Sequence, residues 1–553
     1  MSEVFDDPYL AAQRRKARMR AIIAVVVVFG LVAAFLVMKA RKKAHIESVI
    51  ATSEALMRPG TFDGLHEAAR YVAEQAAADE LAPAAFHVQG LKADLAIWAL
   101  YNGAQSQAAH ARELLEAAEV RGPIDPATNL GKALWQAIRG DATTALAGLA
   151  VGNTGPEGPW HAITRAEASL RSGDLKGARA ALGGCDAGIC RAWSARIAMD
   201  TGEWDAAAAT ADALLGEAAD HPMGLTARAL AGARMEDDQG RVEELQQFME
   251  NTELPPLMSA RVVIALSRAL RRSEGTKRAD ELLERALEAT PEAGLLAQEV
   301  ARSKRFQGYF GASWNRADKA LRSTPTDPGL ITELSASLYF NDAHQLLEDR
   351  LAPARKRGGG DGVRRGDAIV SLIKGLWDTA IEGLEATRHL GEPGDTELFL
   401  AEAYLGAGRY EAAADSARRA WTSLSGTFGE ASREAAVAKM YEGLAISLGG
   451  DPEGARELLE AAYVKDVRTV WGAWLYARHH EANGKARDAK DAYLIACHNG
   501  QDFAKSCLAL ANIYDKLEMD GIMRRTQKEA RRQYLRQSPK GWRAPQVKAA
   551  LGE

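Results

Sequence analysis

The stretch Leu398–Trp421 reads LFLAEAYLGA followed directly by GRYEAAADSARRAW. In both halves small or apolar residues recur at helical spacing, so that they share one face of an α-helix. Gly408 separates the two halves, and a glycine there favours a tight reversal of the chain. Small residues such as Ala401 and Ala413 allow two helices to approach closely. The stretch therefore predicts an antiparallel hairpin of two α-helices.

The same pattern recurs along the chain. Three further segments share one pattern: GDLKGARAALGG (173–184), GEWDAAAATADALL (202–215) and GKARDAKDAYLIA (484–496). Each begins with a glycine turn, usually has a bulky residue two positions later, and has an alanine five positions later. Equivalent positions lie 34 residues apart at Ala286, Ala320 and Ala354, and again at Gly450 and Gly484. Between Ala413 and Ala455 the spacing stretches to 42 residues, which predicts an enlarged loop or longer helices there. A period near 34 is typical of stacked helical hairpins.

This pattern resembles the tetratricopeptide repeat (TPR) family. The residues that match its signature best are Ala401, Tyr404, Gly408, Tyr410, Ala413 and Ala420, and in an earlier unit Ala279, Ala286 and Pro291. The resemblance covers most units of 52–535, is clearest over 160–500 and is weaker over 52–150. It implies an all-α, TPR-like solenoid of about 14 hairpins at ~34 residues each. The alternative, a non-repetitive helical bundle, would not keep this register over five units.

An apolar segment precedes the repeats. Ala21–Met38 (AIIAVVVVFGLVAAFLVM) has 18 residues and no charge, and at 1.5 Å per residue it covers ~27 Å, enough to cross a bilayer core. It is longer than the apolar part of a signal peptide, and the bases that follow it argue against cleavage. The predicted organisation is a basic cytoplasmic tail (1–20), a transmembrane signal anchor (21–38), a juxtamembrane linker (39–51), the solenoid (52–535) and a basic C-terminal tail (536–553).

The charges beside this segment bear on its orientation. The flanking bases are Arg14, Arg15, Lys16, Arg18 and Arg20 on one side and Lys39, Arg41, Lys42 and Lys43 on the other. Five basic residues on one flank against four on the other barely distinguish the two orientations under the positive-inside rule. The short N-terminal tail ends in a dense basic cluster and the chain has no second apolar span, which together favour a solenoid outside the cytoplasm. A solenoid facing the cytoplasm stays open as the alternative.

Four cysteines add evidence on the compartment. Cys185 and Cys190 form one close pair, and Cys497 and Cys507 form another. In the repeat alignment both pairs fall where the second helix of one hairpin meets the first helix of the next, so the Cα separation can suit a disulfide. Two disulfides would indicate an oxidising compartment and the periplasmic orientation. The alternative is four unpaired cysteines that pack as small apolar residues.

Composition and motifs exclude several functional classes. Apolar residues make up 47% and charged residues 26%, with a net charge of −5, which is globular and argues against a nucleic-acid-binding protein. None of the 11 histidines forms a metal or catalytic pattern. No zinc-protease, nucleophile-elbow, phosphate-loop or dinucleotide motif occurs. We therefore expect no catalytic, cofactor-binding or metal-binding residues.

Two basic features remain. Six arginines fall on expected first helices, which line the concave surface in TPR arrays, and they could bind a carboxylate-rich peptide: Arg261, Arg268, Arg271, Arg272, Arg302 and Arg305. The alternative is an ordinary solvated face. The second feature is the stretch with Arg524, Arg525, Lys528, Arg531, Arg532, Arg536, Lys540, Arg543 and Lys548. It predicts a polar cap for the solenoid, or else a site for acidic lipid or an acidic partner.

The layout of one apolar segment followed by a repeat array resembles bacterial membrane-anchored TPR proteins. This resemblance implies a non-catalytic scaffold or co-chaperone, anchored in a bacterial inner membrane, that captures protein or peptide partners in the superhelical groove of a periplasmic array. Two alternatives stay open. The same fold could face the cytoplasm as an assembly factor for a secretion, motility or signalling complex. The chain could also be the regulatory subunit of an enzyme, or a divergent enzyme.

Overall fold

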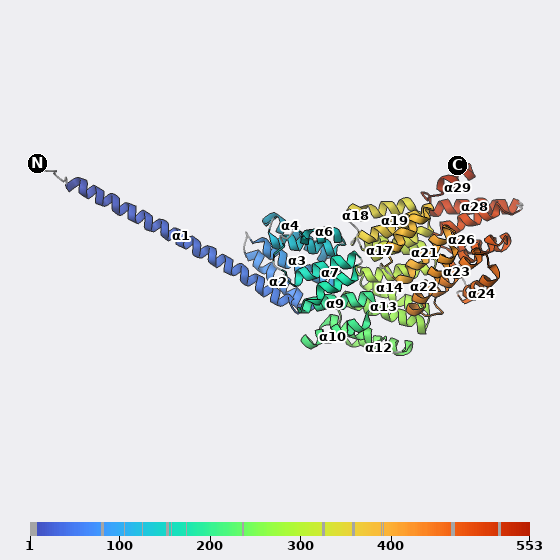
Figure 1. Ribbon diagram of the computed structural model, residues 1–553, viewed down its shortest axis with the longest axis horizontal. Helices are drawn as coiled ribbons and strands as arrows, with labels where there is room; N and C mark the ends of the chain where they lie inside the picture. Colours follow the sequence, from blue (N-terminus) through green and yellow to red (C-terminus); the bar gives the residue numbers. More distant parts are fainter. Residues whose placement is uncertain are drawn as a thin grey trace.

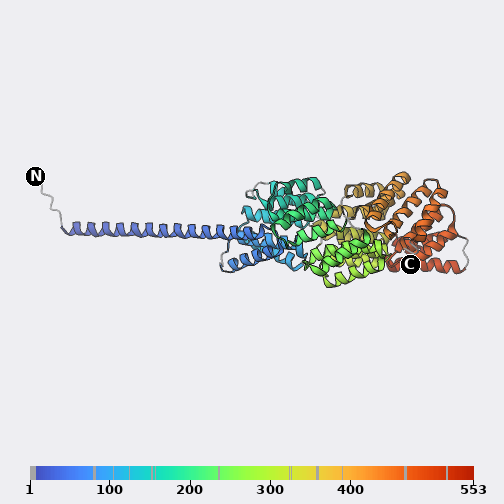
Figure 2. The same ribbon diagram turned by 90° about the horizontal axis from the view of Figure 1, so that it is seen from below.

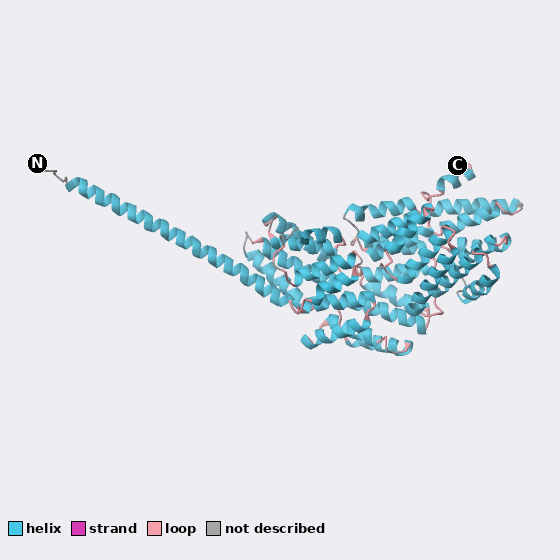
Figure 3. Ribbon diagram, in the orientation of Figure 1, coloured by secondary structure: helices cyan, strands magenta, loops and turns pink. Residues whose placement is uncertain are grey.

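The computed structural model describes residues 8–552 except 79–81, 104, 124, 151–153, 156, 173, 235–236, 323, 325–326, 357–359, 389, 391, 466–469 and 518–520. Over these residues the chain is helical and contains no strand (Figure 3). The helices are α1 (Pro8–Met57), α2 (Phe62–Ala78), α3 (Ala84–Ala96), the π-helix η1 (Ile97–Asn102), α4 (Gln105–Arg121), α5 (Pro126–Ile138), α6 (Ala142–Ala150), α7 (Pro159–Arg171), α8 (Leu175–Gly183), α9 (Gly188–Thr201), α10 (Trp204–Glu217), α11 (Pro222–Gly232), α12 (Asp238–Asn251), α13 (Pro256–Ser273), α14 (Thr276–Ala289), α15 (Gly294–Phe306), α16 (Phe310–Leu321), α17 (Pro328–Phe340), α18 (His344–Lys356), α19 (Gly360–Lys374), α20 (Trp377–Ala386), α21 (Pro393–Gly406), α22 (Tyr410–Phe428), α23 (Arg433–Leu448), α24 (Pro452–Lys465), α25 (Val470–Ala482), α26 (Ala486–Asn499), α27 (Ala504–Tyr514), α28 (Gly521–Gln537) and α29 (Ala544–Leu551).

The helices pair into successive hairpins. Each even-numbered helix from α2 to α28 packs on the odd-numbered helix before it, which makes 14 pairs, and α29 follows the last pair. Odd-numbered helices of neighbouring hairpins also pack on one another, as α13 does on α15 and α21 on α23. This nearest-neighbour stacking is that of a helical-repeat solenoid. The predicted all-α solenoid of helical hairpins is confirmed.

The hairpin α21/α22 shows how the repeat pattern produces this packing. Gly408, between the two helices, has φ +72°, a conformation that glycine adopts without the steric cost that other residues meet. Ala401, Ala413 and Ala417 are completely buried where the helices cross. The phenol of Tyr404 donates a hydrogen bond to Glu385 in the preceding hairpin, at 2.6 Å. Small residues thus set the close approach, and the aromatic residue links neighbouring hairpins.

Replacing Ala413 with tryptophan is expected to destabilise this hairpin, because overpacking a filled helix crossing costs about 1–3 kcal/mol or more. Hydrogen exchange should accelerate in α21 and α22 and change little in distant hairpins, since stability in a solenoid is largely local. Tryptophan at Thr422, an exposed position of the same helix, is the matched control. Equal acceleration over the whole array would contradict the local packing.

The longer repeat spacing between Ala413 and Ala455 is explained by helix length. Helix α22 has 19 residues and α23 has 16, whereas α19–α21 have between 10 and 15. Of the two predicted explanations, the structure therefore shows longer helices at this place.

Helix α13 joins the two largest hydrophobic cores of the array. One core runs from Met57 to Ala279 and includes Val262 of α13. The other runs from Ala260 to Val547 and includes Val263 of the same helix. Because adjacent residues of one helix enter both cores, the two halves share a packed boundary and form one elongated body (Figures 1 and 2).

The second half of the array turns back on itself. The backbone N–H of Gln501 donates to the Gly308 carbonyl at 3.2 Å, and the N–H of Gly311 donates to the Gln501 carbonyl at 3.2 Å. Arg271 of α13 pairs with Glu434 of α23 at 2.7 Å, across 163 positions of sequence. Hairpins that are distant in the sequence therefore touch.

Helix α1 runs straight into the body. It has 50 residues and projects far beyond the other helices (Figures 1 and 2). Near its end Val49, Ser53 and Met57 are buried, and just beyond it the Ile189 N–H donates to the Arg58 carbonyl at 2.9 Å. The segment 39–51, expected as a juxtamembrane linker, is thus part of a continuous helix whose last turns form the first hairpin with α2.

Candidate interaction surfaces

The six arginines predicted to bind a partner lie on α13 and α15, the first helices of two hairpins, but other parts of the chain bind them. Arg302 and Arg305 are 2% and 0% exposed. Arg302 donates to Asp395 of α21 at 2.8 Å. Arg305 donates to the same carboxylate at 2.8 Å and to Glu333 of α17 at 3.0 Å. One aspartate therefore holds two buried guanidinium groups.

The other four arginines are also paired within the fold: Arg261 with Asp200 at 2.5 Å, Arg268 with Glu299 at 3.2 Å, Arg271 with Asp280 and Glu434 at 2.8 and 2.7 Å, and Arg272 with Asp238 at 2.6 Å. Arg271, Arg302 and Arg305 are therefore buried and inaccessible to a partner. Arg261, Arg268 and Arg272 keep between 12 and 30% of their side chains exposed, and partner binding by these three stays a prediction. The spacing of these residues in the sequence predicts which face of each helix they occupy. It does not predict which helices from distant parts of the chain pack on that face. The buried pairs join distant hairpins instead of presenting charge to a peptide.

Aromatic side chains pack between helices further along the array. Phe306 of α15 stacks on Trp471 of α25, with ring centroids 5.4 Å apart. Phe310 of α16 stacks on Phe340 of α17 at 4.2 Å and meets Phe503, just before α27, at 4.9 Å. These rings form one buried aromatic cluster that joins hairpins distant in the sequence.

The buried ion pairs shift the pKa values of their carboxyl groups. Burial opposes ionisation of Asp395, but the charges of Arg302 and Arg305 outweigh it and hold the pKa at about 2. Burial likewise opposes ionisation of Glu299, and Arg268 and Arg302 hold its pKa at about 2. Both carboxylates are therefore more acidic in the folded protein than in an unfolded chain.

We expect the array to lose stability as the pH falls from about 4.5 to 2. In this window the unfolded chain binds protons at groups that the folded protein keeps ionised, so acid favours unfolding. The pKa falls from 3.8 to about 2 for Asp395 and from 4.5 to about 2 for Glu299, which corresponds to roughly 2 and 3 kcal/mol of stability at neutral pH. Urea unfolding at pH 7, 4 and 3 measures the loss. A Glu299→Gln variant should show a shallower pH dependence, and an unchanged slope would contradict the assignment.

Both cysteine pairs lie at hairpin junctions. Cys185 follows α8 and Cys190 lies in the first turn of α9, while Cys497 is near the end of α26 and Cys507 is in α27. Each pair is joined by a disulfide bond, with Cα separations of 6.1 and 4.7 Å. Each bridge links the second helix of one hairpin to the first helix of the next.

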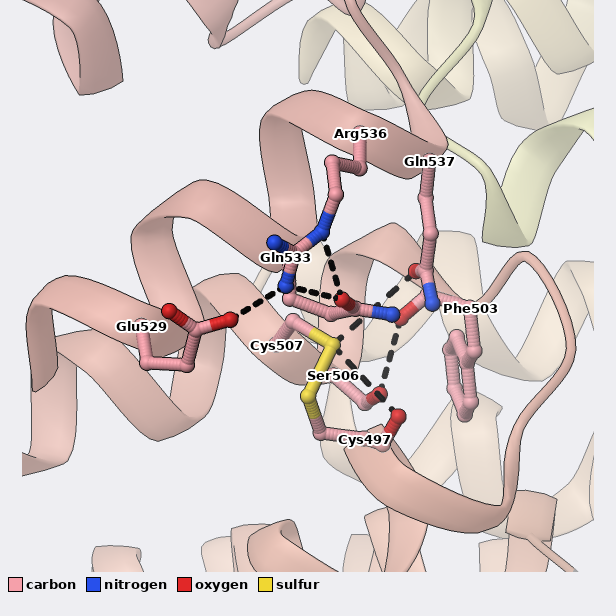
Figure 4. Close-up of a disulfide and its surroundings, with 8 residues drawn as sticks. All are labelled: Cys497, Phe503, Ser506, Cys507, Glu529, Gln533, Arg536 and Gln537. Carbon is pink, nitrogen blue, oxygen red and sulfur yellow. Dashed lines mark hydrogen bonds and ion pairs between the residues drawn. A yellow bond between two sulfur atoms is a disulfide. The ribbon is translucent and has the colours of Figure 1, made fainter. Parts of the chain in front are cut away.

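The Cys497–Cys507 bridge lies beneath the C-terminal helix α28 (Figure 4). Its Cys507 sulfur is 3.9 Å from the Gln537 side-chain oxygen, and neither cysteine is more than 1% exposed. Cys185 of the other pair is only half-buried. A reducing agent therefore has easier access to Cys185–Cys190.

Mild reduction is expected to open Cys185–Cys190 before Cys497–Cys507, because of this difference in exposure. The loops that they close span 6 and 11 residues, so each bridge contributes at most about 2–3 kcal/mol. The array should stay helical while hydrogen exchange rises at the two junctions. Differential alkylation and mass spectrometry give the order of opening. The reverse order, or global loss of helicity, would contradict the expectation.

The structure offers no ligand set for a metal: among the described residues, no group of three or more His, Cys, Asp or Glu side chains is suitably placed. His479 is buried, and its Nδ1 lies 2.8 Å from the Ser447 hydroxyl. His480 lies edge-on against the Tyr476 ring at 4.4 Å. These two histidines are packing residues of α25.

The C-terminal basic stretch forms the last two helices. Helix α28 buries Gln527, Ala530 and Tyr534 against the array and carries its bases on the outer side, as the capping helix of a solenoid does. Three of the bases form ion pairs: Arg531 with Asp515, Arg536 with Glu529, and Arg543 with Asp342. The exposed remainder is Arg524, Arg525, Lys528, Arg532, Lys540 and Lys548.

Helix α1 is the one candidate membrane span among the described helices. Its most apolar 18-residue window has a mean hydropathy of 3.1, and no residue of that window is buried. The length and composition of this helix suit a bilayer, and the rest of the fold leaves its apolar window uncovered.

Comparison with known proteins finds a likeness only among solved structures. No protein-family model and no curated protein matches the chain. Among 173 matching chains of solved structures is one described as "Crystal structure of APC/C hetero-tetramer Cut9-Hcn1". It has 13% sequence identity to this chain and a TM-score of 0.40, and the match covers 81% of this chain and 88% of that chain.

Proposed function

We propose that this chain is a non-catalytic scaffold or co-chaperone, anchored by α1 in a bacterial inner membrane, whose helical-hairpin array binds other proteins on the periplasmic side. The main observation behind the proposal is that α1 has an uncovered apolar part and a buried end. Its apolar part has no packing partner, whereas its last turns are buried in the first hairpins. Burial of that apolar surface in lipid would remove it from water and hold the array beside the membrane.

The cysteine pairs support the periplasmic side. Two disulfides at equivalent hairpin junctions suit an oxidising compartment and would be reduced in most cytoplasms. The basic N-terminal tail and the single apolar segment agree with this orientation.

Partner binding is proposed on the outer surfaces of the array. In the C-terminal half Phe306, Phe340 and Trp471 are buried in contacts between hairpins, so these first-helix side chains are not available to a partner. The second helices of the hairpins and the C-terminal cap keep polar, solvated faces. Solenoids can spread many weak contacts over such extended surfaces.

Photo-crosslinking in intact cells tests this function. A photoreactive residue at Glu411, exposed on α22, should yield discrete protein adducts that are recovered from the membrane fraction. The same residue at Tyr441, buried in α23, serves as the control and should yield none. If photoreactive residues at Glu411 and at exposed positions of the other second helices give no adduct, the scaffold function is wrong.

A further inference from the structure

We propose that a pocket at the C-terminal cap binds an acidic protein segment through lysine side chains and an exposed tryptophan. The pocket lies between the start of α18, the loop after α28 and the start of α29, and its lining includes His344, Pro539, Lys540, Trp542, Pro545 and Lys548. The inference rests on the proposed scaffold function and assigns it one binding site and one class of partner.

The pocket is built on a fixed backbone. The backbone N–H of Trp542 donates to the backbone carbonyl of Asp342 at 2.9 Å. The Asp342 carboxylate accepts from the Tyr534 hydroxyl at 2.7 Å and from the Arg543 guanidinium at 2.7 Å. Asp342 is completely buried, with φ +56°. A loop pinned in this way loses little conformational entropy on binding, which favours affinity.

Its lining combines an apolar surface with unpaired positive charge. Trp542 is 42% exposed although its neighbours hold it in place, and the His344 ring lies edge-on to it at 5.1 Å. Lys540 and Lys548 are exposed, and no carboxylate of the described residues lies within 4.0 Å of either ammonium group. The buried Nδ1 of His344 has no hydrogen-bond partner within that part of the chain.

These groups select the chemistry of the ligand. Carboxylates would bind the lysine ammonium groups, and an apolar or proline side chain would cover the indole face. Tryptophan is enriched at protein–protein contact points and often dominates their affinity. An acidic segment with an apolar anchor matches both properties.

The place of the pocket favours a protein over the membrane. Helix α1 enters one end of the body, and α28 and α29 lie at the other end in both views (Figures 1 and 2). If α1 spans the bilayer, the cap points away from the lipid that holds this chain. Anionic headgroups of that membrane are therefore remote from Lys540 and Lys548.

Fluorescence anisotropy on the full chain in nanodiscs of neutral lipid tests the site. The probe is a fluorescein-labelled peptide of glutamate and leucine residues, and a peptide with lysine in place of glutamate is its control. Trp542→Ala and the double variant Lys540→Glu/Lys548→Glu should each weaken binding by about tenfold or more. Trp542→Phe should retain most of the affinity because it keeps an aromatic ring.

The matched control is Arg524→Glu/Arg525→Glu, which reverses two charges near the other end of α28 and should change affinity by less than about twofold. Equal weakening by this control would overturn the pocket in favour of a diffuse basic surface. No binding of the acidic peptide to the parent chain would overturn it outright. A third outcome would assign the site to lipid: the parent chain binds vesicles that contain phosphatidylglycerol, Trp542→Ala abolishes this binding, and the acidic peptide does not bind. The photo-crosslinking experiment distinguishes failure of the pocket from failure of the scaffold function. If Trp542→Ala still gives protein adducts, the scaffold function remains supported even when the pocket proposal is wrong.

Discussion

Replacing Asp395 with asparagine is expected to lower the free energy of unfolding of the C-terminal half by about 3–5 kcal/mol, the cost of breaking a buried ion pair from one side. Asp395 is the shared acceptor of Arg302 and Arg305, which stay buried when its charge is removed. Asparagine keeps the volume and one carbonyl oxygen but cannot balance two guanidinium groups. Hydrogen exchange of α15, α17 and α21 should therefore accelerate far more than that of α3–α10.

The matched control is Asp415→Asn in α22. Asp415 pairs with Arg418, but both side chains are 52% exposed, and such surface pairs contribute about 0–1 kcal/mol. Its effect on urea unfolding should be close to zero. If the two variants are equally stable, the buried network does not hold the turns of the superhelix together.

Removing residues 1–43 is expected to move the protein completely from the membrane fraction to the soluble fraction. The deletion takes away the apolar Ala21–Met38 segment, whose burial in lipid would be the main attachment to the bilayer. It keeps Val49, Ser53 and Met57, which pack in the first hairpins. The truncated chain should remain highly helical by circular dichroism and as stable to urea as the intact array.

A deletion of residues 1–57 separates anchoring from folding. It should also release the protein, but it removes the buried end of α1, so hydrogen exchange in α2 and α3 should accelerate. Carbonate washing of membranes followed by immunoblotting distinguishes an integral protein from an adsorbed one. Retention of the 44–553 chain in washed membranes would show that α1 is not the main anchor.

The local architecture follows from the sequence because it depends on local physics. The 34-residue period, the glycine turns and the small residues at crossings such as Ala401 and Ala413 determine which segments form helices and how neighbours pack. Both cysteine pairs could be placed at hairpin junctions for the same reason. The stretched spacing after Ala413 likewise corresponds to the longer helices α22 and α23.

The repeat pattern could not predict contacts between hairpins that are distant in the sequence. Arg302 and Arg305 lie at helical spacing on α15, but Asp395, their partner, is about 90 residues further along. No period in the sequence specifies how hairpins distant in the sequence pack on one another, so the burial of Arg302 and Arg305 could not be predicted from their helical spacing. The carboxylates of neighbouring first helices, Glu299, Glu333 and Asp395, were the signal that could have indicated mutual pairing.

Thiol trapping in intact cells tests the central claim most directly, since it joins the repeat register to the side of the membrane. Cells that express the full chain are quenched with acid, free thiols are alkylated under denaturing conditions, and the intact mass is measured. The periplasmic scaffold predicts that none of the four cysteines is alkylated before reduction and that all four are alkylated afterwards. Four alkylated cysteines in the unreduced sample would contradict the periplasmic orientation and favour an array that faces the cytoplasm.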